Sequence, residues 1–283
     1  ESDPSSLLDE SMRSILYPNH PYGRPIIGWK HEIMELNYDD VKSFYKTHYE
    51  PRNTVLVISG NINLKKAKEI VKKNFSKIKN SNTSKFKETL DPNLNSQVFV
   101  EKKHSTVKQD IWKKLYRADS YNKSIKRGIA LDLGMKIIAG GTSSLLYDEF
   151  VNKKKIFSMI GGFYQGLSRG EGYIYFYAIP NEKIEPKKID NLIMKQIKIL
   201  VKNELSLKRL EIEKKKYFYD SIYRMDGILK PSEIYGEALT VGLTLSEVEN
   251  WNKNLDDITI ELVKEEMLKF IENKNYVIGS LQN

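Results

Sequence analysis

The stretch YDDVKSFYKTHYEPRNTVLVISG, residues 38–60, predicts a helix followed by a short strand. Asn37 is a suitable helix N-cap, acidic residues fill the first turn, and Pro51 ends the helix. The apolar run NTVLVISGNI then predicts a buried strand bounded by Gly60. The same order returns in TIELVKEEMLKFIENKNYVIGSL, residues 259–281, as an amphipathic helix, a polar break and a strand that contains a glycine. The chain therefore carries a weak internal duplication.

A polar stretch between the two copies predicts a domain boundary. Residues 81–95, SNTSKFKETLDPNLN, contain few apolar side chains, which is typical of a surface linker. We therefore divide the chain into a first unit at 1–80 and a second unit at 96–283. Two apolar and aromatic runs in the second unit, 156–166 and 172–180, predict an antiparallel hairpin. If the second copy of the repeat is complete, the first unit lacks about its first half.

The composition is that of a protein with a buried core. Of the 283 residues, 40% are hydrophobic and 11% aromatic, which is enough for two α/β units. No apolar run reaches the ~18 residues that a membrane-spanning helix needs. The chain has no cysteine, which excludes disulfides, cysteine–zinc and iron–sulfur sites and a thiol nucleophile. These properties leave a periplasmic and a cytoplasmic location equally open.

The basic charge does not by itself indicate a nucleic-acid site. The net charge of +9 comes from lysines that are spread over predicted helix faces, with acidic residues among them. There is no arginine-rich tract and no RNA-binding or DNA-binding motif. We therefore expect solvated surfaces and no nucleic-acid partner.

Four motifs, taken together and in this order, resemble the M16 metallopeptidase family, which includes pitrilysin, insulin-degrading enzyme and mitochondrial processing peptidase. They are HPYGRPIIGW at 20–29, FYKTHYEPRNTVLVISGNI at 44–62, AGGTSSLLYDEFV at 139–151 and YVIGSL at 276–281. The style is that of bacterial members about two domains long. The resemblance implies an α+β protein of the LuxS/MPP-like type. Two similar domains, each a mainly antiparallel sheet backed by helices, face one another across a chamber, and the first is incomplete here.

The zinc site of that family has no counterpart in this sequence. In the family an inverted HxxEH motif supplies two zinc ligands and the glutamate that activates water, and a more distant glutamate is the third ligand. No two of the four histidines here are four residues apart: His20, His31, His48 and His104. Because the family's zinc residues all precede the HPYG loop, the chain is expected to begin after them. We therefore expect zinc in a longer parent protein, and neither a metal ligand nor activity in this chain alone.

A second family feature is also missing. Many members carry an arginine and a tyrosine seven residues apart after the glycine-rich loop, where they orient the substrate and stabilise the oxyanion. The resemblance places Val151 and Ser158 at those positions, and neither can do that chemistry. Either the parent is inactive, or a partner supplies the pair. The second alternative implies a heterodimer with an M16 subunit that carries the pair. A homodimer is the other assembly that we expect.

Two further segments have both a structural and a functional interpretation. His20 lies in a loop rich in proline and glycine with no acidic or histidine partner nearby in sequence, so we expect a structural brace. Gly140, Gly141, Thr142 and Ser143 precede a predicted helix. They either cap that helix, with Thr142 or Ser143 as the N-cap, or line the chamber and approach the substrate backbone.

The aromatic residues of the predicted hairpin leave two alternatives open as well. They face either the core or a peptide-binding chamber, because side chains alternate along a strand. The set is Phe163, Tyr164, Tyr173, Tyr175, Phe176 and Tyr177.

The function expected from these observations is part of a zinc-dependent endopeptidase. The parent would cleave peptides or unfolded segments that enter the chamber as an added β-strand, held by backbone hydrogen bonds. The alternative is a non-catalytic peptide-binding or scaffolding M16 subunit that works with a partner chain.

Overall fold

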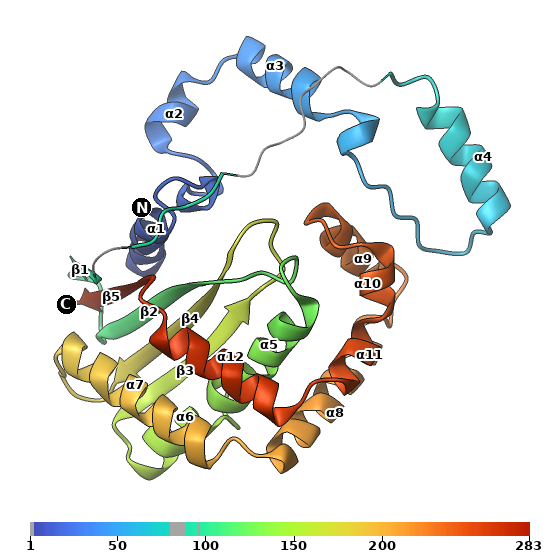
Figure 1. Cartoon of the computed structure of the whole chain (residues 1–283). Helices are drawn as coiled ribbons and strands as arrows, with labels where there is room; N and C mark the ends of the chain where they lie inside the picture. The colour runs from blue at the N-terminus through green and yellow to red at the C-terminus, as the bar shows by residue number, and fades with distance from the viewer. Residues whose placement is uncertain (1–2, 80–88, 95–96) are drawn as a thin grey trace.

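A five-stranded sheet forms the centre of the molecule, in the order β1-β5-β2-β4-β3 (Figure 1). The computed structural model describes residues 3–79, 89–94 and 97–283. Only β1 and β5 run parallel, and the other neighbouring pairs are antiparallel. The expected mainly antiparallel sheet backed by helices is therefore confirmed. The strands are β1 Val98–Lys103, β2 Ile111–Ala118, β3 Phe157–Gln165, β4 Gly172–Pro180 and β5 Tyr276–Gln282.

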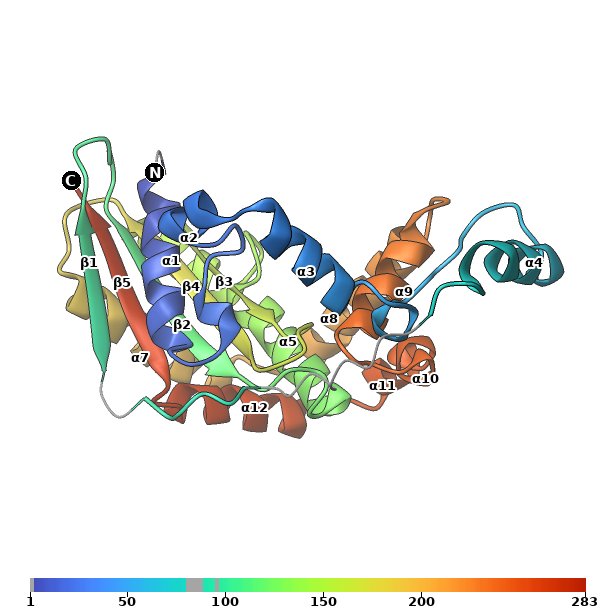
Figure 2. The ribbon, with the colours of Figure 1, turned by 90° about the horizontal axis from the view of Figure 1, so that it is seen from above.

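Three helices cover one face of the sheet, which we call the back face (Figure 2). Strand β4 turns Ile174, Phe176 and Ala178 into this core, and all three are fully buried. The central helix is apolar on most sides because it lies between the sheet and further helices. The three are α5 Ile125–Ala139, α7 Pro186–Asn203 and α12 Ile260–Glu272.

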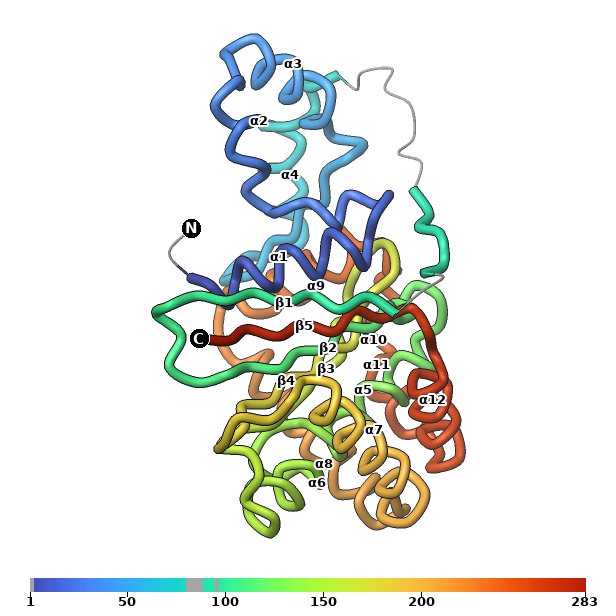
Figure 3. Tube along the Cα trace, turned by 90° about the vertical axis from the view of Figure 1, so that its left-hand side faces the viewer, coloured from blue at the N-terminus to red at the C-terminus, as the bar shows by residue number. Residues whose placement is uncertain are grey.

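Helix α1, Pro4–Leu16, packs on the opposite or front face of the sheet (Figure 3). Its stripe of Leu8, Met12 and Leu16 is fully buried against β1, β5 and β2. The helix approaches β5 closely at Gly279, where a Cβ atom would lie 2.3 Å from Met12 Sδ. Although α1 belongs to the first unit by chain order, it therefore completes the hydrophobic core of the second.

The rest of the first unit lies away from the sheet, beyond α1 in Figure 3. It comprises α2 Lys30–Glu35, α3 Tyr38–His48 and α4 Leu64–Phe75, with the short 3₁₀ turns η1 Pro21–Gly23 and η2 Pro51–Asn53. The predicted N-cap of α3 is confirmed, and Asn37 and Asp40 form a reciprocal capping box. Helices α2, α3 and α4 have no buried residue.

The strand predicted at 53–62 is not formed. Its backbone has no strand partner among the described residues, and Val55, Leu56 and Ile58 are 41%, 51% and 44% exposed. The physical reason is that a strand exists only through hydrogen bonds to a neighbour, whereas a helix makes its own. The sequence correctly predicts an extended apolar segment, but the described residues contain no neighbouring strand with which it could pair.

The remaining predicted elements are present with small shifts. Helix α5 begins at Ile125, because Ser124 is its N-cap. The N-cap predicted at Thr142 or Ser143 is Ser144, whose side chain accepts from Tyr147 N. The other elements are α6 Leu145–Tyr147, the π-helical turn η3 Asp148–Lys153, α8 Leu207–Arg224, α9 Lys230–Thr240, α10 Leu245–Glu249 and α11 Trp251–Asp256.

Within the described part of the chain, each helix is too short or too polar to cross a lipid bilayer.

Candidate functional site on the front face of the sheet

Helix α1 leaves the β4 and β3 end of the front face open. The alternation of side chains along these two strands resolves the question of the aromatic residues. Tyr164 and Phe176 point to the back face and are buried in the core. The others lie on the front face: Phe163, Tyr173, Tyr175 and Tyr177. One hairpin therefore serves both the core and an accessible aromatic surface.

This surface, which we call the aromatic strip, consists of Met159, Phe163, Tyr175 and Tyr177. Phe163 stacks on Tyr175 at a centroid distance of 5.2 Å, and the Tyr175 ring lies 6.1 Å from that of Tyr177. Met159 and Phe163 are 47% and 46% exposed. Gly161 is necessary for this arrangement, because a Cβ atom there would lie 2.7 Å from the Tyr177 hydroxyl. The strip offers apolar contact area with hydroxyl groups among it.

Strand β3 is the edge of the sheet beside this strip. It pairs with β4 alone among the described strands, so its other side presents backbone donors and acceptors that can receive an extended peptide. The pairing slips between Phe157 and Met159, which places Ser158 at a bulge. An open edge next to exposed aromatic residues is a combination that can hold a peptide by its backbone and by alternate side chains.

Helix α1 sets one border of the aromatic strip through polar contacts. Asp9 accepts from the ammonium group of the buried Lys113 at 2.8 Å and from the Tyr175 hydroxyl at 3.4 Å. Arg13 donates to the Tyr173 hydroxyl at 3.0 Å and lies over its ring. Burial and the nearby Asp9 carboxylate raise the pKa of Tyr175, which keeps its hydroxyl neutral.

Of the two positions that correspond to the family's arginine and tyrosine, one lies in the turn before β3 and the other at the start of β3. Val151 is in the π-helical turn η3, partly buried against the back-face core. Ser158 is exposed, and its hydroxyl donates to the Ile179 carbonyl at 3.2 Å. Between them Lys155 has a left-handed φ of 53°, the conformation that glycine adopts most readily. That neither side chain can replace the family's arginine and tyrosine stays a prediction.

The proposed substrate loop, Gly140 to Ser143, follows the end of α5. Gly140 caps that helix, and a Cβ atom there would lie 2.6 Å from the Lys136 backbone. Gly141 has a φ of +81° with open space around it, and the next two residues are exposed. The loop is accessible, and its role in substrate binding stays a prediction.

The loop around His20 joins the first unit to the second. The backbone N–H groups of Asn19 and His20 donate to the Asp91 carboxylate at 2.7 and 3.0 Å. The Tyr22 hydroxyl accepts from the backbone N–H groups of Arg169 and Gly170, in the turn between β3 and β4. The His20 ring packs against Tyr22 and accepts from its backbone N–H. These contacts agree with a bracing role for the loop.

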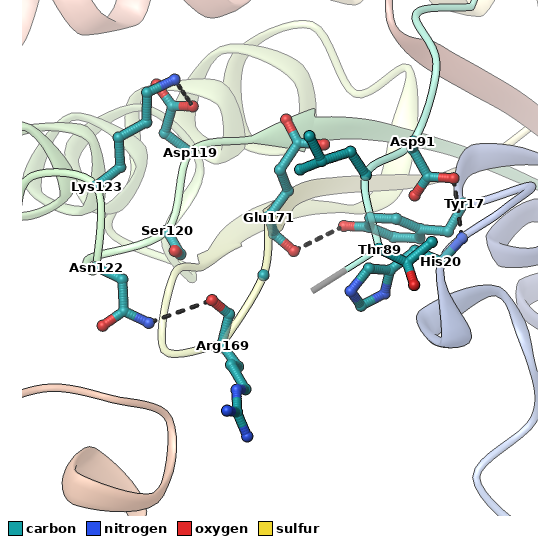
Figure 4. A pocket seen from close by; sticks show the side chains of 12 residues that line it. Tyr17, His20, Thr89, Asp91, Asp119, Ser120, Asn122, Lys123, Arg169 and Glu171 are labelled. Atoms are coloured by element: carbon teal, nitrogen blue, oxygen red, sulfur yellow. Dashed lines mark hydrogen bonds and ion pairs between the residues drawn. The ribbon is translucent and has the colours of Figure 1, made fainter. Parts of the chain in front are cut away.

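A polar cavity of about 340 Å³ lies at this junction (Figure 4). Tyr17, His20, Asp91 and Glu171 surround one side of it, and the Tyr17 hydroxyl donates to the Gly172 carbonyl at 2.7 Å. Lys123 and Asp119 form an ion pair at 2.8 Å on the other side. The lining carries charges of both signs, so the cavity has no clear preference for an anion or a cation.

Arg117 of β2 is a buried cation that lies close to two acidic residues of the cavity, Asp91 and Glu171. Its guanidinium is 3% exposed and donates to the Pro92 carbonyl at 2.7 Å. It lies 3.7 Å from the Glu171 carboxylate and 3.9 Å from that of Asp91. Burial raises the pKa of Glu171, and Arg117 opposes that shift. This junction was not predicted from the sequence, although the charged residues of KKLYR, 113–117, inside an otherwise strand-like run were a signal of it.

The described residues do not fit a zinc site. Across residues 3–79, 89–94 and 97–283, no three His, Cys, Asp or Glu side chains lie close enough to share a metal ion. His20 packs against tyrosines, His48 against Phe44, and His104 contacts the Thr106 hydroxyl. No catalytic step through a metal can therefore be derived from this chain.

Comparison with known proteins gives the family. The model of the M16 peptidase inactive domain matches residues 35–217, more than half of the chain. The chain belongs to the M16 peptidase family. The zinc protease PqqE of Helicobacter pylori is 26% identical over 231 residues, which cover 78% of this chain and 50% of that protein. The chain thus spans about half the length of this curated M16 relative.

Solved structures show the same fold. A protease from Helicobacter pylori superimposes with a TM-score of 0.89 at 21% identity, covering 99% of this chain and 68% of that one. An M16 inactive domain from Pseudomonas fluorescens gives a TM-score of 0.84 at 18% identity, covering 99% and 65%. The arrangement of α1, the loop and the sheet is therefore shared with other M16 folds.

Proposed function

We propose that this chain is the peptide-holding part of a zinc-dependent M16 endopeptidase whose zinc residues precede Glu1 in a longer protein. The observation that carries the proposal is the free edge of β3 beside the aromatic strip. Support for a peptidase parent comes from the M16 family match and from the zinc protease that is 26% identical. In this proposal 1–80 is the end of a first domain, 81–95 a linker and 96–283 a second domain that binds no zinc.

The physical basis of peptide holding is strand addition. A peptide that pairs with β3 satisfies its own backbone hydrogen bonds, so it is bound with little demand on sequence. Every second side chain of that peptide faces the front of the sheet, where Phe163, Tyr175 and Tyr177 offer apolar area. Unfolded segments fit such a site because they can become extended, whereas folded proteins cannot.

A non-catalytic subunit is the second candidate. It is favoured by Val151 and Ser158 at the positions where many M16 members have arginine and tyrosine, and by the family model's description as an inactive domain. In that case the chain binds peptide or serves as a scaffold within a homodimer, or within a heterodimer with a subunit that carries the missing pair.

Peptide binding by this chain is the first test. A fluorescent peptide with alternating aromatic side chains is titrated, and its anisotropy is measured. Phe163→Ser is expected to weaken binding about tenfold, because it removes an exposed ring from the aromatic strip. Phe99→Ser is a matched control, since Phe99 has the same 46% exposure but lies on β1, at the other edge of the sheet. Equal affinity of the two variants, or no binding at all, contradicts the proposal.

The peptidase part of the proposal needs the longer protein. Zinc content and cleavage of an unfolded substrate are measured for the longer protein and for the 283-residue chain, with and without a chelator. About one zinc per longer chain, with activity that chelation abolishes, supports the endopeptidase. Zinc without activity until a second M16 subunit is added favours the partnered alternative, and absence of zinc favours the scaffold.

A further inference from the structure

The hydroxyl group of Tyr177 differs from those of the other two tyrosines on the front face of β4. The Tyr173 hydroxyl accepts a hydrogen bond from Arg13, and the Tyr175 hydroxyl donates one to Asp9. Helix α1 supplies both of these partners. Among the described residues the Tyr177 hydroxyl has no hydrogen-bond partner, and its ring lies beside that of Tyr175. A half-buried hydroxyl in this state is available to a bound molecule.

The ring of Tyr177 reaches across to the edge strand. Tyr177 is paired with Gly161 of β3. A Cβ atom at Gly161 would lie 2.7 Å from the Tyr177 hydroxyl oxygen and 2.9 Å from Cζ. The tip of the ring therefore occupies the place of a side chain on β3, and Gly161 is buried beneath it. The hydroxyl group thus lies at the free edge of the sheet, although its residue belongs to the next strand in.

Apolar side chains lie on either side of this hydroxyl along the edge. Met159 and Phe163 are two residues before and after Gly161, so all three share the front face of β3. Both side chains are exposed. The edge therefore presents an apolar group, the hydroxyl of Tyr177 and a second apolar group, in that order.

A peptide strand added to β3 would meet these three groups in register. The peptide residue opposite Gly161 turns its side chain to the front face, with its Cβ atom about 5 Å from the place of a Gly161 Cβ. The peptide residues two positions away lie opposite Met159 and Phe163. A side chain with a hydroxyl or amide group at the central position can bond the Tyr177 hydroxyl, which both donates and accepts. An apolar side chain there would cover that hydroxyl without replacing its bonds to water, which is unfavourable.

We propose that Tyr177 is a specificity-determining residue of the β3 edge. It selects extended peptides in which a serine, threonine, asparagine or glutamine lies between two apolar residues, each two positions away. The nearby charges of Asp9 and Lys113 pair with one another, which favours a neutral side chain at the central position. The inference rests on the proposed function, because it needs β3 to receive the peptide.

Two fluorescent peptides that differ in one residue test this selection. The central residue is threonine or valine, which have the same shape, and a leucine lies two positions to either side. Anisotropy is measured as the 283-residue chain is added. The threonine peptide is expected to bind about fivefold more tightly, because it alone offers a hydrogen bond to the hydroxyl. Tyr177→Phe is expected to bind the two peptides equally, by losing affinity for the threonine peptide.

Tyr173→Phe is the matched control for that variant. It removes a hydroxyl from the same face of the same strand, but Tyr173 lies opposite Gln165 and its hydroxyl is bonded to Arg13. The fivefold ratio between the peptides is expected to remain in this variant. Gly161→Ala gives a second test, because the added Cβ atom would displace the Tyr177 hydroxyl, and the ratio is expected to fall. Circular dichroism shows that each variant keeps its fold.

Equal binding of the two peptides by the unmodified chain overturns the selection by Tyr177. A preference for threonine that persists in Tyr177→Phe, or that is lost equally in Tyr173→Phe, overturns it as well. In these cases the peptides still bind, so peptide holding at the edge stands. Failure of both peptides to bind removes the proposed function, and the selection with it.

Discussion

The two copies of the repeat have the same local pattern and opposite burial. In α12, Val263 and Met267 are fully buried and Phe270 is 4% exposed. In α3, Val41 and Phe44 are 59% and 58% exposed. Both helices begin at a capping side chain, and both precede an apolar extended segment, but only β5 has strand neighbours. Local sequence thus fixes the helix and its ends, whereas burial requires a sheet to pack on.

Removing one ring from each copy should give the largest contrast. Phe270→Ala is expected to lower the free energy of unfolding by about 3–5 kcal/mol, because Phe270 packs on Phe176 and Tyr116 in the core. Phe44→Ala in α3 is expected to cost less than about 0.5 kcal/mol, as for other exposed positions. Urea unfolding followed by circular dichroism measures both values. Similar losses in the two variants would mean that α3 is buried in solution.

Weakening the contact between α1 and the sheet should cause the next largest loss in the free energy of unfolding. Asp9→Ala is expected to lower the free energy of unfolding by about 2 kcal/mol, because Lys113 stays buried with only part of its partners. The ammonium group keeps its bonds to the Ser5 carbonyl and hydroxyl, which limits the loss. Glu10→Ala removes the same charge from the next position and is the control. Equal unfolding curves for the two variants would place α1 elsewhere.

The loop that joins the units should have a smaller effect. Tyr22→Phe removes the acceptor of two backbone N–H groups in the turn between β3 and β4, at an expected cost of about 1 kcal/mol. Tyr38→Phe, at a tyrosine that is 74% exposed on α3, is expected to be neutral. Thermal unfolding distinguishes them. A neutral Tyr22→Phe would show that the brace is not formed in solution.

The pH dependence of stability should differ between a buried carboxyl group of the second unit and an exposed one of the first. Burial raises the pKa of Asp132, on α5, above its ordinary 3.8, although Lys136 and Arg224 oppose the shift and Glu213 adds to it. A raised folded-state pKa means that the folded protein binds the extra proton, so this group stabilises most below the ordinary value and loses that contribution as pH rises.

Asp132→Asn is therefore expected to gain stability relative to the wild type as pH rises from about 4 to 7. Asp39→Asn, in the exposed first turn of α3, is the control and is expected to show no comparable trend. Unfolding free energies at several pH values measure both. The opposite slope for Asp132→Asn would mean that the ion pair with Lys136 outweighs burial.

Most helices and the antiparallel hairpin follow from the sequence, because capping residues, apolar periodicity and turn residues act locally. The cap at Asn37 is an example. What could not be predicted depends on distant partners. The packing of α1 on the other unit's sheet could not be predicted, because it depends on the close contact between Met12 and the distant Gly279. The junction around Arg117 could not be predicted either, because it depends on where residues 89–94 run. At the candidate site, the alternation of side chains along β4 predicts aromatic residues on both faces of the sheet. The part of the front face that stays accessible depends on where α1 packs, which the sequence does not predict.

The position of β5 has a consequence for how the protein reaches this structure. It is the last of the five described strands in sequence order, and it lies between β1 and β2, with Val277 beside both Val98 and Leu115. During synthesis the place between β1 and β2 therefore stays vacant until Tyr276–Gln282 leave the ribosome, and until then β1 and one side of β2 remain unpaired. We expect slow completion of the sheet and a need for protection from aggregation. A chain released before Tyr276 would lack the strand that joins β1 to β2.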